Sequence, residues 1–232
     1  MNLCVIPARG GSKRIPRKNI KLFAGNPIIS YAINAAVHSG LFHRVIVTTD
    51  DDEIAKISRG LGADTPFKRP AELADDHTPT LPVIAHAISE LQSGTTQRID
   101  FVCCIYPAVP FVQIDDIRSG LELLKQSGAN YTFPVAEFPS AIQRGLKRLS
   151  NGCLLPLTPQ HELTRTQDLE PYFFDAGQFY WGRASTWLTT NKGLHSDSSG
   201  LIIPQWRVVD IDTVDDWKRA ELIYRALFFG AT

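Results

Sequence analysis

Short apolar runs alternate with amphipathic segments through the first half of the chain. Residues 2–7, 44–50 and 100–106 are dominated by apolar side chains over the length typical of buried strands. Between them, apolar residues recur at helical spacing, for example over residues 79–91. This alternation predicts right-handed βαβ units and an open, mainly parallel sheet covered on both faces. Further helices are predicted to begin at Pro27 and Asp51 and to include residues 114–124.

The pattern changes in the second half of the chain. Two short runs within residues 132–157 flank Asn151-Gly152, a dipeptide typical of the turn of a β-hairpin. Residues 156–171 are polar and bounded by prolines, which indicates a loop. We predict one α/β domain over residues 1–232, with a small hairpin and loop excursion at about residues 140–172. Late strands are predicted over residues 174–181 and 208–211, and a closing helix over residues 213–228.

The composition is that of an ordinary globular protein. Hydrophobic residues make up 44% and charged residues 21% of the 232 positions, which argues against a disordered chain. No apolar run approaches the ~20 residues that cross a bilayer, and no signal-peptide pattern follows Met1. We therefore expect a soluble, cytoplasmic protein without a membrane partner. The cysteines show no CxxC spacing, and Cys4, Cys103 and Cys104 stand in apolar runs, which favours buried thiols over a zinc site.

The net charge is zero, but the cations cluster near the start of the chain. Residues 1–49 contain seven Lys and Arg residues and no Asp or Glu, and six of these cations fall within residues 9–21. A local basic block in a neutral protein favours a small anionic ligand over nucleic acid, which usually selects a basic protein.

The basic block coincides with a glycine-containing loop, PARGGSKRIPRKNI, at residues 7–20. Ligands of open parallel sheets bind beyond the carboxyl ends of the strands, where this loop lies. Gly10 and Gly11 allow the backbone to bring its N–H groups to phosphate oxygens, and Arg9 can add a planar cation. The loop has neither P-loop spacing nor the dinucleotide fingerprint, which weakens kinase, GTPase and dehydrogenase interpretations. A bound triphosphate is the remaining prediction.

A second chemical signal is the run VVDID near the end of the chain. Asp210 and Asp212 stand at i and i+2, so on a strand their carboxylates point to the same side. Paired oxygen ligands suit Mg²⁺, which keeps several waters and shares phosphate oxygens with the protein. We predict a Mg²⁺ site at these two residues, although Asp212 alone could serve to cap the following helix.

Taken together, these motifs resemble a known family. The run at residues 7–20 is similar to the signature loop of the cytidylyltransferases that activate nine-carbon acidic sugars as CMP-sugars, the CMP-sialic acid synthetase family. Within that family, the pattern FxRPxELADDxT and the run DAGQFYWG look most like pseudaminic acid cytidylyltransferases. The resemblance continues through TTDD at 48–51, RPAELADD at 69–76, YPAVP at 106–110 and VDID at 209–212.

The resemblance implies a Rossmann-like fold of the nucleotide-diphospho-sugar transferase type. It also implies a homodimer, with the excursion as the dimer contact or the sugar side. The reaction it implies is transfer of a cytidylyl group from CTP to an acidic nine-carbon sugar with Mg²⁺, for glycan biosynthesis. The implied catalytic residues are Lys13, Lys18, Asp210 and Asp212. The implied nucleotide-binding residues are Ala8, Arg9, Gly10, Gly11, Ser12, Asn19, Arg69 and Thr80, and the implied sugar-binding residues are Tyr106, Arg165, Gln167, Asp175 and Gln178.

Two departures from the sialic acid pattern bear on the sugar. The chain has YPAVP where sialic acid synthetases often have QPTSP, and DAGQ where they tend to have NGA. Both segments face the sugar in the family, so we expect pseudaminic acid. Legionaminic acid, N-acetylneuraminic acid and the eight-carbon sugar KDO stay open, as does a nucleotide-sugar-binding protein without catalysis. The base that accepts the anomeric proton is open between Asp212 and a metal-bound hydroxide.

Overall fold

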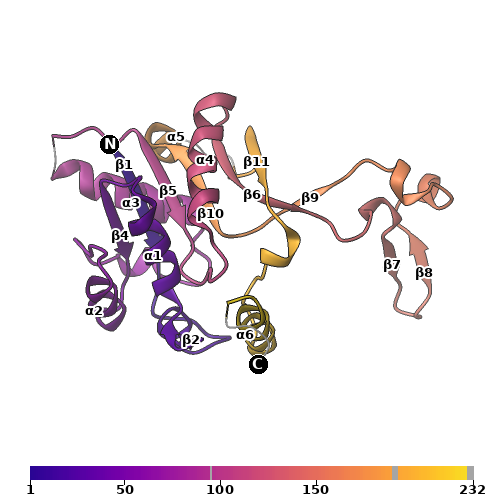
Figure 1. Ribbon diagram of the computed structural model, residues 1–232, viewed down its shortest axis with the longest axis horizontal. Coiled ribbons are helices and arrows are strands. Elements are labelled where there is room, and N and C mark those ends of the chain that lie inside the picture. Colours follow the sequence, from indigo (N-terminus) through magenta and orange to yellow (C-terminus); the bar gives the residue numbers. More distant parts are fainter. Residues whose placement is uncertain (95, 190–192, 229–232) are drawn as a thin grey trace.

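One seven-stranded sheet forms the centre of the computed structural model, which describes residues 1–94, 96–189 and 193–228 (Figure 1). The strand order is β11-β6-β10-β5-β1-β4, and β9 pairs with β6 beyond the end of β10. The strands are β1 (Asn2–Pro7), β4 (Arg44–Thr48), β5 (Phe101–Ile105), β6 (Tyr131–Glu137), β9 (Phe173–Asp175), β10 (Phe179–Arg183) and β11 (Ser198–Ile202). A separate ribbon before the first helix pairs β2 (Leu22–Phe23) with β3 (Asn26–Pro27).

Strands β4, β1, β5, β6 and β11 run parallel to one another, whereas β10 and β9 run antiparallel to them. Val5 of β1 lies between Ile46 of β4 and Cys104 of β5. The prediction of an α/β fold with an open, mainly parallel sheet is therefore confirmed. The carboxyl ends of the parallel strands meet at one edge, where ligands of such sheets bind.

Helices cover both faces of the sheet. Along β1 the side chains alternate: Cys4 and Ile6 pack in the cluster that contains residues of α1 and α4, while Leu3 and Val5 pack in the cluster with residues of α3 and α5. Burial on both faces explains why these strands are continuous apolar runs in the sequence. The helices are α1 (Ile29–Ser39), α2 (Asp52–Gly60), α3 (Thr80–Ser93), α4 (Ile114–Ser127), α5 (Ala184–Thr189) and α6 (Val214–Phe228).

The predicted excursion projects away from the sheet, at the right of Figure 1. The chain leaves β6 at Glu137 and returns beside it at Phe173 of β9. Between these points, β7 (Leu146–Arg148) and β8 (Leu154–Pro156) form the hairpin that Asn151-Gly152 predicts. Several of its leucines are exposed, namely Leu146, Leu154, Leu155 and Leu157.

Two predictions for late strands are wrong. Residues 208–211 form no strand and lie instead in the segment that lines the second cavity, whereas β11, which sequence analysis missed, pairs with β6. Residues 174–181 are divided between β9 and β10, and the chain turns between them at Gly177, whose φ of 62° suits glycine. In the described part of the chain, no helix combines the length and apolarity needed to span a membrane.

Candidate active site

Two cavities meet at the carboxyl-terminal edge of the sheet. The first is lined largely by the loop after β1 and by the segment that leads into α3. The second is lined by the loop after β5, the β9–β10 connection and the segment before α6. Lys18, Tyr106, Pro107 and Asp212 line both cavities, so the two form one continuous site.

The first cavity gathers most residues predicted to bind a nucleotide. Its position at the end of β1 follows from the βαβ topology, because the loop after β1 must cross the sheet edge before α1. Ala8, Gly10 and Gly11 are not part of the lining: Ala8 is fully buried, and its N–H donates to the Thr48 carbonyl (3.0 Å). The predicted residues in the lining are Arg9, Ser12, Lys13, Lys18, Asn19, Arg69 and Thr80.

Gly10 packs against the start of α2. Its N–H donates to Oδ1 of Asp50 (2.9 Å), so this N–H is engaged within the protein. A Cβ atom on Gly10 would lie 2.8 Å from Oδ2 of Asp51, which is too close for any larger residue without a shift. Close packing, rather than a phosphate cradle, therefore explains the glycine at this position.

An internal carboxylate occupies the cationic end of the first cavity. Asp76 forms ion pairs with Arg9 (2.7 Å) and with Lys13. Arg9 also donates to the carbonyl of Asp75 (2.6 Å). The hydrogen bond from Lys13, and then that from Arg9, lowers the pKa of Asp76. The two cations therefore already surround an anion, which is what a phosphate group would require of them.

The inner wall of the first cavity is formed by Arg69, Thr80 and Tyr106. Arg69 is buried, and its guanidinium donates to the carbonyl of Thr48. Burial lowers the pKa of Arg69 to about 10, which leaves it charged at neutral pH. Thr80 Oγ1 and the Tyr106 hydroxyl share a hydrogen bond of 2.9 Å. These groups offer fixed polar contacts deep in the cavity.

The acidic pair lies at the junction with the second cavity. Asp210 lines the second cavity and Asp212 lines both. Asp212 pairs with Arg14 (2.8 Å) and Lys18 (3.4 Å). Partial loss of hydration, followed by the neighbouring Asp212 carboxylate, raises the pKa of Asp210. Although the predicted strand is absent, the sequence prediction that the two carboxylates face one site holds geometrically.

These two carboxylates fit a magnesium ion that also binds phosphate. Oxygen ligands suit Mg²⁺, and repulsion between the carboxylates favours a cation beside them. Among the described residues, no group of three or more Asp, Glu, His or Cys side chains could hold a metal. Ligands other than acidic side chains, such as water and nucleotide phosphates, would complete the shell.

Gln178 and Asp175 form the opposite wall of the second cavity. The Gln178 amide is buried, and its Nε2 donates to the Arg207 carbonyl (2.9 Å), whereas its Oε1 has no hydrogen-bond partner among the described residues. Asp175 is more engaged: it accepts from the Gly177 N–H (2.8 Å) and from the Tyr180 hydroxyl (2.8 Å). Gln178 is therefore the group on this wall with free hydrogen-bonding capacity.

Two predicted sugar-binding residues lie elsewhere. Arg165 and Gln167 are on the excursion and line neither cavity, and Arg165 pairs with Asp168 (2.8 Å). The polar excursion is tied to the sheet only at its ends, so it does not fold back over its own site. A single chain therefore does not bring these two residues to either cavity, and their role in sugar binding stays a prediction.

Five charged residues in the linings received no role from the sequence, namely Arg14, Asp75, Asp76, Arg207 and Arg219. Arg14 and Asp76 stand within the motifs at residues 7–20 and 69–76, so the sequence could have suggested them as site residues. Arg207 lines the second cavity and pairs with Asp116 of α4, and nothing in its local sequence indicates this.

The chain is similar over most of its length to known proteins. A family model described as cytidylyltransferase matches residues 3–180. The chain is 40% identical over 224 residues to pseudaminic acid cytidylyltransferase from Campylobacter jejuni subsp. jejuni serotype O:2, with 97% of this chain and 96% of that protein covered. It is 30% identical to CMP-N,N'-diacetyllegionaminic acid synthase from Legionella pneumophila, with 94% of each chain covered.

A solved structure shares the fold. CMP:2-keto-3-deoxy-manno-octonic acid synthetase, complexed with CTP, matches with a TM-score of 0.70 at 15% identity, over 98% of this chain and 99% of that chain. At this identity the similarity shows the fold.

Proposed function

Because the chain belongs to the cytidylyltransferase family, we propose that it transfers the cytidylyl group of CTP to pseudaminic acid and releases pyrophosphate. The product, CMP-pseudaminic acid, would supply the sugar for glycans such as modified flagellin or surface polysaccharide. The observation that carries the proposal is the two-part site, in which Lys18 and Asp212 stand at the junction of the cavities. Such a junction suits transfer of a phosphoryl centre from one ligand to another.

CTP would occupy the first cavity. Arg9, Ser12 and Lys13 can donate hydrogen bonds to triphosphate oxygens once Asp76 releases the two cations. Arg69 and Thr80 lie deeper in the same cavity and offer donors to the cytosine end. Asn19 is held by a hydrogen bond to the Arg9 carbonyl (2.9 Å), so it braces the loop as well as lining the cavity.

Asp210 and Asp212 would hold Mg²⁺, as the fit of their carboxylates supports. When bound, Mg²⁺ supplies positive charge that polarises the α-phosphate and offsets the charge of the departing pyrophosphate. Lys18 adds a second positive charge at this junction, because it lines both cavities.

The transfer is a single displacement at the α-phosphorus. The anomeric hydroxyl oxygen of the sugar would form a bond to this phosphorus as the bond to the oxygen bridging to the β-phosphate breaks on the opposite side. The hydroxyl proton would pass to Asp212 or to water, and pyrophosphate would leave with the bridging oxygen. The residues act mostly by positioning the two ligands in line and by stabilising negative charge on phosphate oxygens. Lys13 and Lys18 are suited to the second task by their places in the first cavity.

The sugar would occupy the second cavity, opposite the acidic pair. The Oε1 of Gln178 is buried without a partner among the described residues, and a small shift of the side chain would let it accept a hydrogen bond from a hydroxyl or an acylated amine of the sugar. A buried acceptor of this kind penalises a sugar that leaves it unpaired. Tyr106 and Asp175 line the same cavity and complete its polar wall.

A homodimer and a cytoplasmic location are part of the proposal. The exposed leucines of the excursion form an apolar surface suited to a second copy, and Arg165 and Gln167 would then lie near that interface. Cys4, Cys103 and Cys104 are free and buried, which suits a reducing compartment where CTP is available.

The proposal is tested by supplying CTP, Mg²⁺ and one nonulosonic acid at a time while measuring pyrophosphate. We expect release with pseudaminic acid and at least ~10²-fold lower kcat/KM with N-acetylneuraminic acid, because a site built for one hydrogen-bonding group rejects analogues that lack it. Binding of CTP without pyrophosphate release for any sugar would instead indicate a binding protein. Reduction of NAD in parallel assays would indicate a dehydrogenase.

A further inference from the structure

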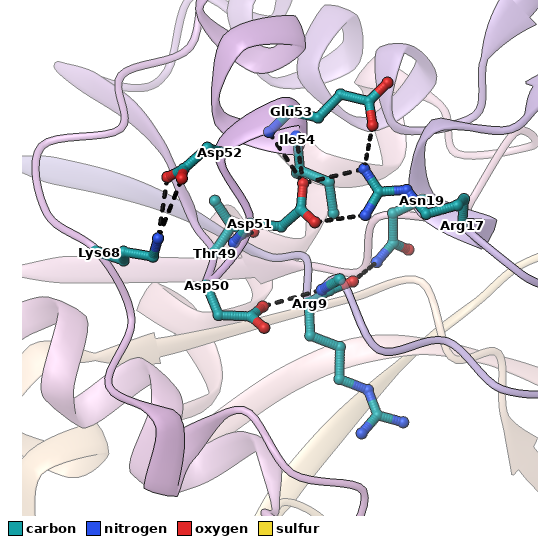
Figure 2. Close-up of polar contacts among 11 residues, drawn as sticks. Arg9, Arg17, Asn19, Thr49, Asp50, Asp51, Asp52, Glu53, Ile54 and Lys68 are labelled. Carbon is teal, nitrogen blue, oxygen red and sulfur yellow. Dashed lines mark hydrogen bonds and ion pairs between the residues drawn. The ribbon is translucent and has the colours of Figure 1, made fainter.

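A polar network joins the loop after β1 to the start of α2, outside both cavities (Figure 2). The guanidinium of Arg17 donates to both carboxylate oxygens of Asp51, with an Nη2 to Oδ1 distance of 3.1 Å, and also donates to Glu53. None of these three residues lines either of the two cavities, and the side chains of Arg17 and Glu53 are 39% and 63% exposed, so the network lies at the surface beside the site.

Asp51 is held in place independently of the loop. Its Oδ1 accepts from the N–H groups of Glu53 (3.0 Å) and Ile54 (2.9 Å), which caps α2. Its own N–H donates to Thr49 Oγ1 (3.1 Å). The hydrogen bond from Arg17 is the largest of the effects that lower its pKa to about 2. Asp51 is therefore a fixed, ionised anchor point on the helix.

The loop meets this anchor at two places. Near its start, Gly10 packs so closely on Asp51 that a Cβ atom would lie 2.8 Å from Oδ2. Near its end, Arg17 adopts a left-handed backbone with φ of 56°, which is uncommon for a residue with a side chain. Lys18 and Asn19 follow directly and line the first cavity. The segment that carries Ser12 and Lys13 thus packs against Asp51 at one end and is ion-paired with it through Arg17 at the other.

We propose that Arg17 and Asp51 are positioning residues that hold this loop ready for CTP. The inference rests on the proposed function, since CTP is the ligand of the first cavity. With the pair intact, the backbone of the loop is already in its binding arrangement, and CTP has to displace only the side-chain ion pairs of Arg9 and Lys13 with Asp76. Without the Arg17–Asp51 pair, a smaller fraction of the protein molecules has the loop in the binding arrangement. The apparent affinity for CTP then falls by the same factor. Saturating CTP restores the arrangement, so kcat is largely retained.

Two substitutions isolate this pair from its neighbours. Asp51→Asn keeps an oxygen that can cap α2 and removes the charge that Arg17 requires. Arg17→Asn removes the guanidinium and keeps a residue type that tolerates the left-handed region. Asp52→Asn and Lys68→Ala are matched controls, because this exposed pair (3.1 Å) lies at the same helix start and contacts neither Arg17 nor the loop.

We expect each test variant to raise the KM for CTP about 5- to 10-fold, in line with a lost charge-assisted pair, with kcat within about threefold of the unmodified protein. The double variant should be no worse than the poorer single variant, since both remove one interaction. Arg17→Lys, which keeps the charge but not the fork, should recover part of the loss. The controls should match the unmodified protein.

A readout that needs no nucleotide separates this inference from the proposed function. In the free protein, trypsin should cleave after Arg14 faster in Asp51→Asn than in Asp52→Asn, because the loop is released. Unchanged KM and unchanged cleavage in folded variants would overturn the positioning role. Failure of the unmodified protein to bind CTP would overturn the proposed function instead, while faster cleavage would still show that the pair holds the loop.

Discussion

Lys18 donates a hydrogen bond of 2.9 Å to the main-chain carbonyl of Ile211, although the two residues are 193 positions apart in the chain. The same ammonium group lies 3.4 Å from Asp212. The basic loop after β1 and the acidic segment before α6 therefore meet through one side chain. Any movement of either segment changes the geometry at the junction of the two cavities.

Replacing Lys18 should affect the chemical step more than stability. Lys18→Ala should lower kcat at least ~10²-fold, because the variant loses a charge at the phosphoryl centre. Lys21→Ala is a fair control, since the Lys21 ammonium lies 4.7 Å from the Trp217 ring centroid and outside both cavities. Steady-state pyrophosphate release with CTP and the sugar at saturating concentrations would measure kcat for the two variants. Similar losses in the two variants would contradict the assignment.

The acidic pair should confer metal dependence. Asp210→Asn or Asp212→Asn should each lower turnover at least ~10²-fold, as expected for loss of a preorganised electrostatic contact. Chelation by EDTA should abolish activity in the unmodified protein, and added Mg²⁺ should restore it. Full activity in excess EDTA would exclude the magnesium site.

Removing the internal anion of the first cavity should improve nucleotide binding. Asp76→Asn frees Arg9 and Lys13 from their ion pairs, so the KM for CTP should fall by roughly two- to fivefold, the range typical of exposed pairs. The effect should shrink at high salt, which screens both competing anions. A rise in KM would instead mean that Asp76 contacts the bound nucleotide complex.

Gln178 should determine which sugar is accepted. Gln178→Met keeps the side-chain volume and removes the buried acceptor, so the preference for pseudaminic acid over N-acetylneuraminic acid should erode about tenfold or more. The KM for CTP should stay within a few-fold, because Gln178 lines only the second cavity. The ratio of kcat/KM values for the two sugars is the measurement. An unchanged ratio would mean that a residue other than Gln178 determines the sugar preference.

Acid should weaken the protein through Asp51. The carboxyl has a folded-state pKa of about 2, below its ordinary value of 3.8. Its stabilising contribution is therefore complete above about pH 4 and is lost as the pH falls towards 2. The ionised Asp51 carboxylate contributes at most roughly 2 kcal/mol to the free energy of unfolding. The contribution is reduced because solvent screens Arg17, which is 39% exposed. Urea unfolding of the unmodified protein and Asp51→Asn should differ at pH 6 and converge near pH 2.

The sequence predicts the parts of the molecule whose signals are local. Buried parallel strands are continuous apolar runs, so β1, β4 and β5 can be identified without knowledge of their neighbours. Motifs likewise identify Arg9, Lys13 and Lys18 of the first cavity. β11 has the sequence SSGLI, with only two apolar residues, so the apolar-run signal that identifies β1, β4 and β5 does not mark it, and only its pairing with β6 shows it to be a strand.

Contacts between distant segments are the part that the sequence did not predict. The pairing of Arg207 with Asp116 and of Asp76 with Lys13 depends on how loops pack after the sheet forms. The role of Arg165 stays a prediction: its chemistry suits a sugar carboxylate, and within one chain it lines neither cavity. Residue type therefore indicates the chemistry that a side chain can perform, whereas the fold determines whether that side chain lies in the site.

The excursion has a consequence for the architecture as a whole. Its two ends lie side by side, because Glu137 pairs with Phe173 and the Phe138 N–H donates to the Tyr172 carbonyl (2.9 Å). Residues 138–172 therefore act, for the sheet, as one long connection between the antiparallel neighbouring strands β6 and β9. Lengthening or shortening such a turn costs little in closure entropy. This segment can therefore diverge as an exchangeable module while the nucleotide half of the site stays unaltered.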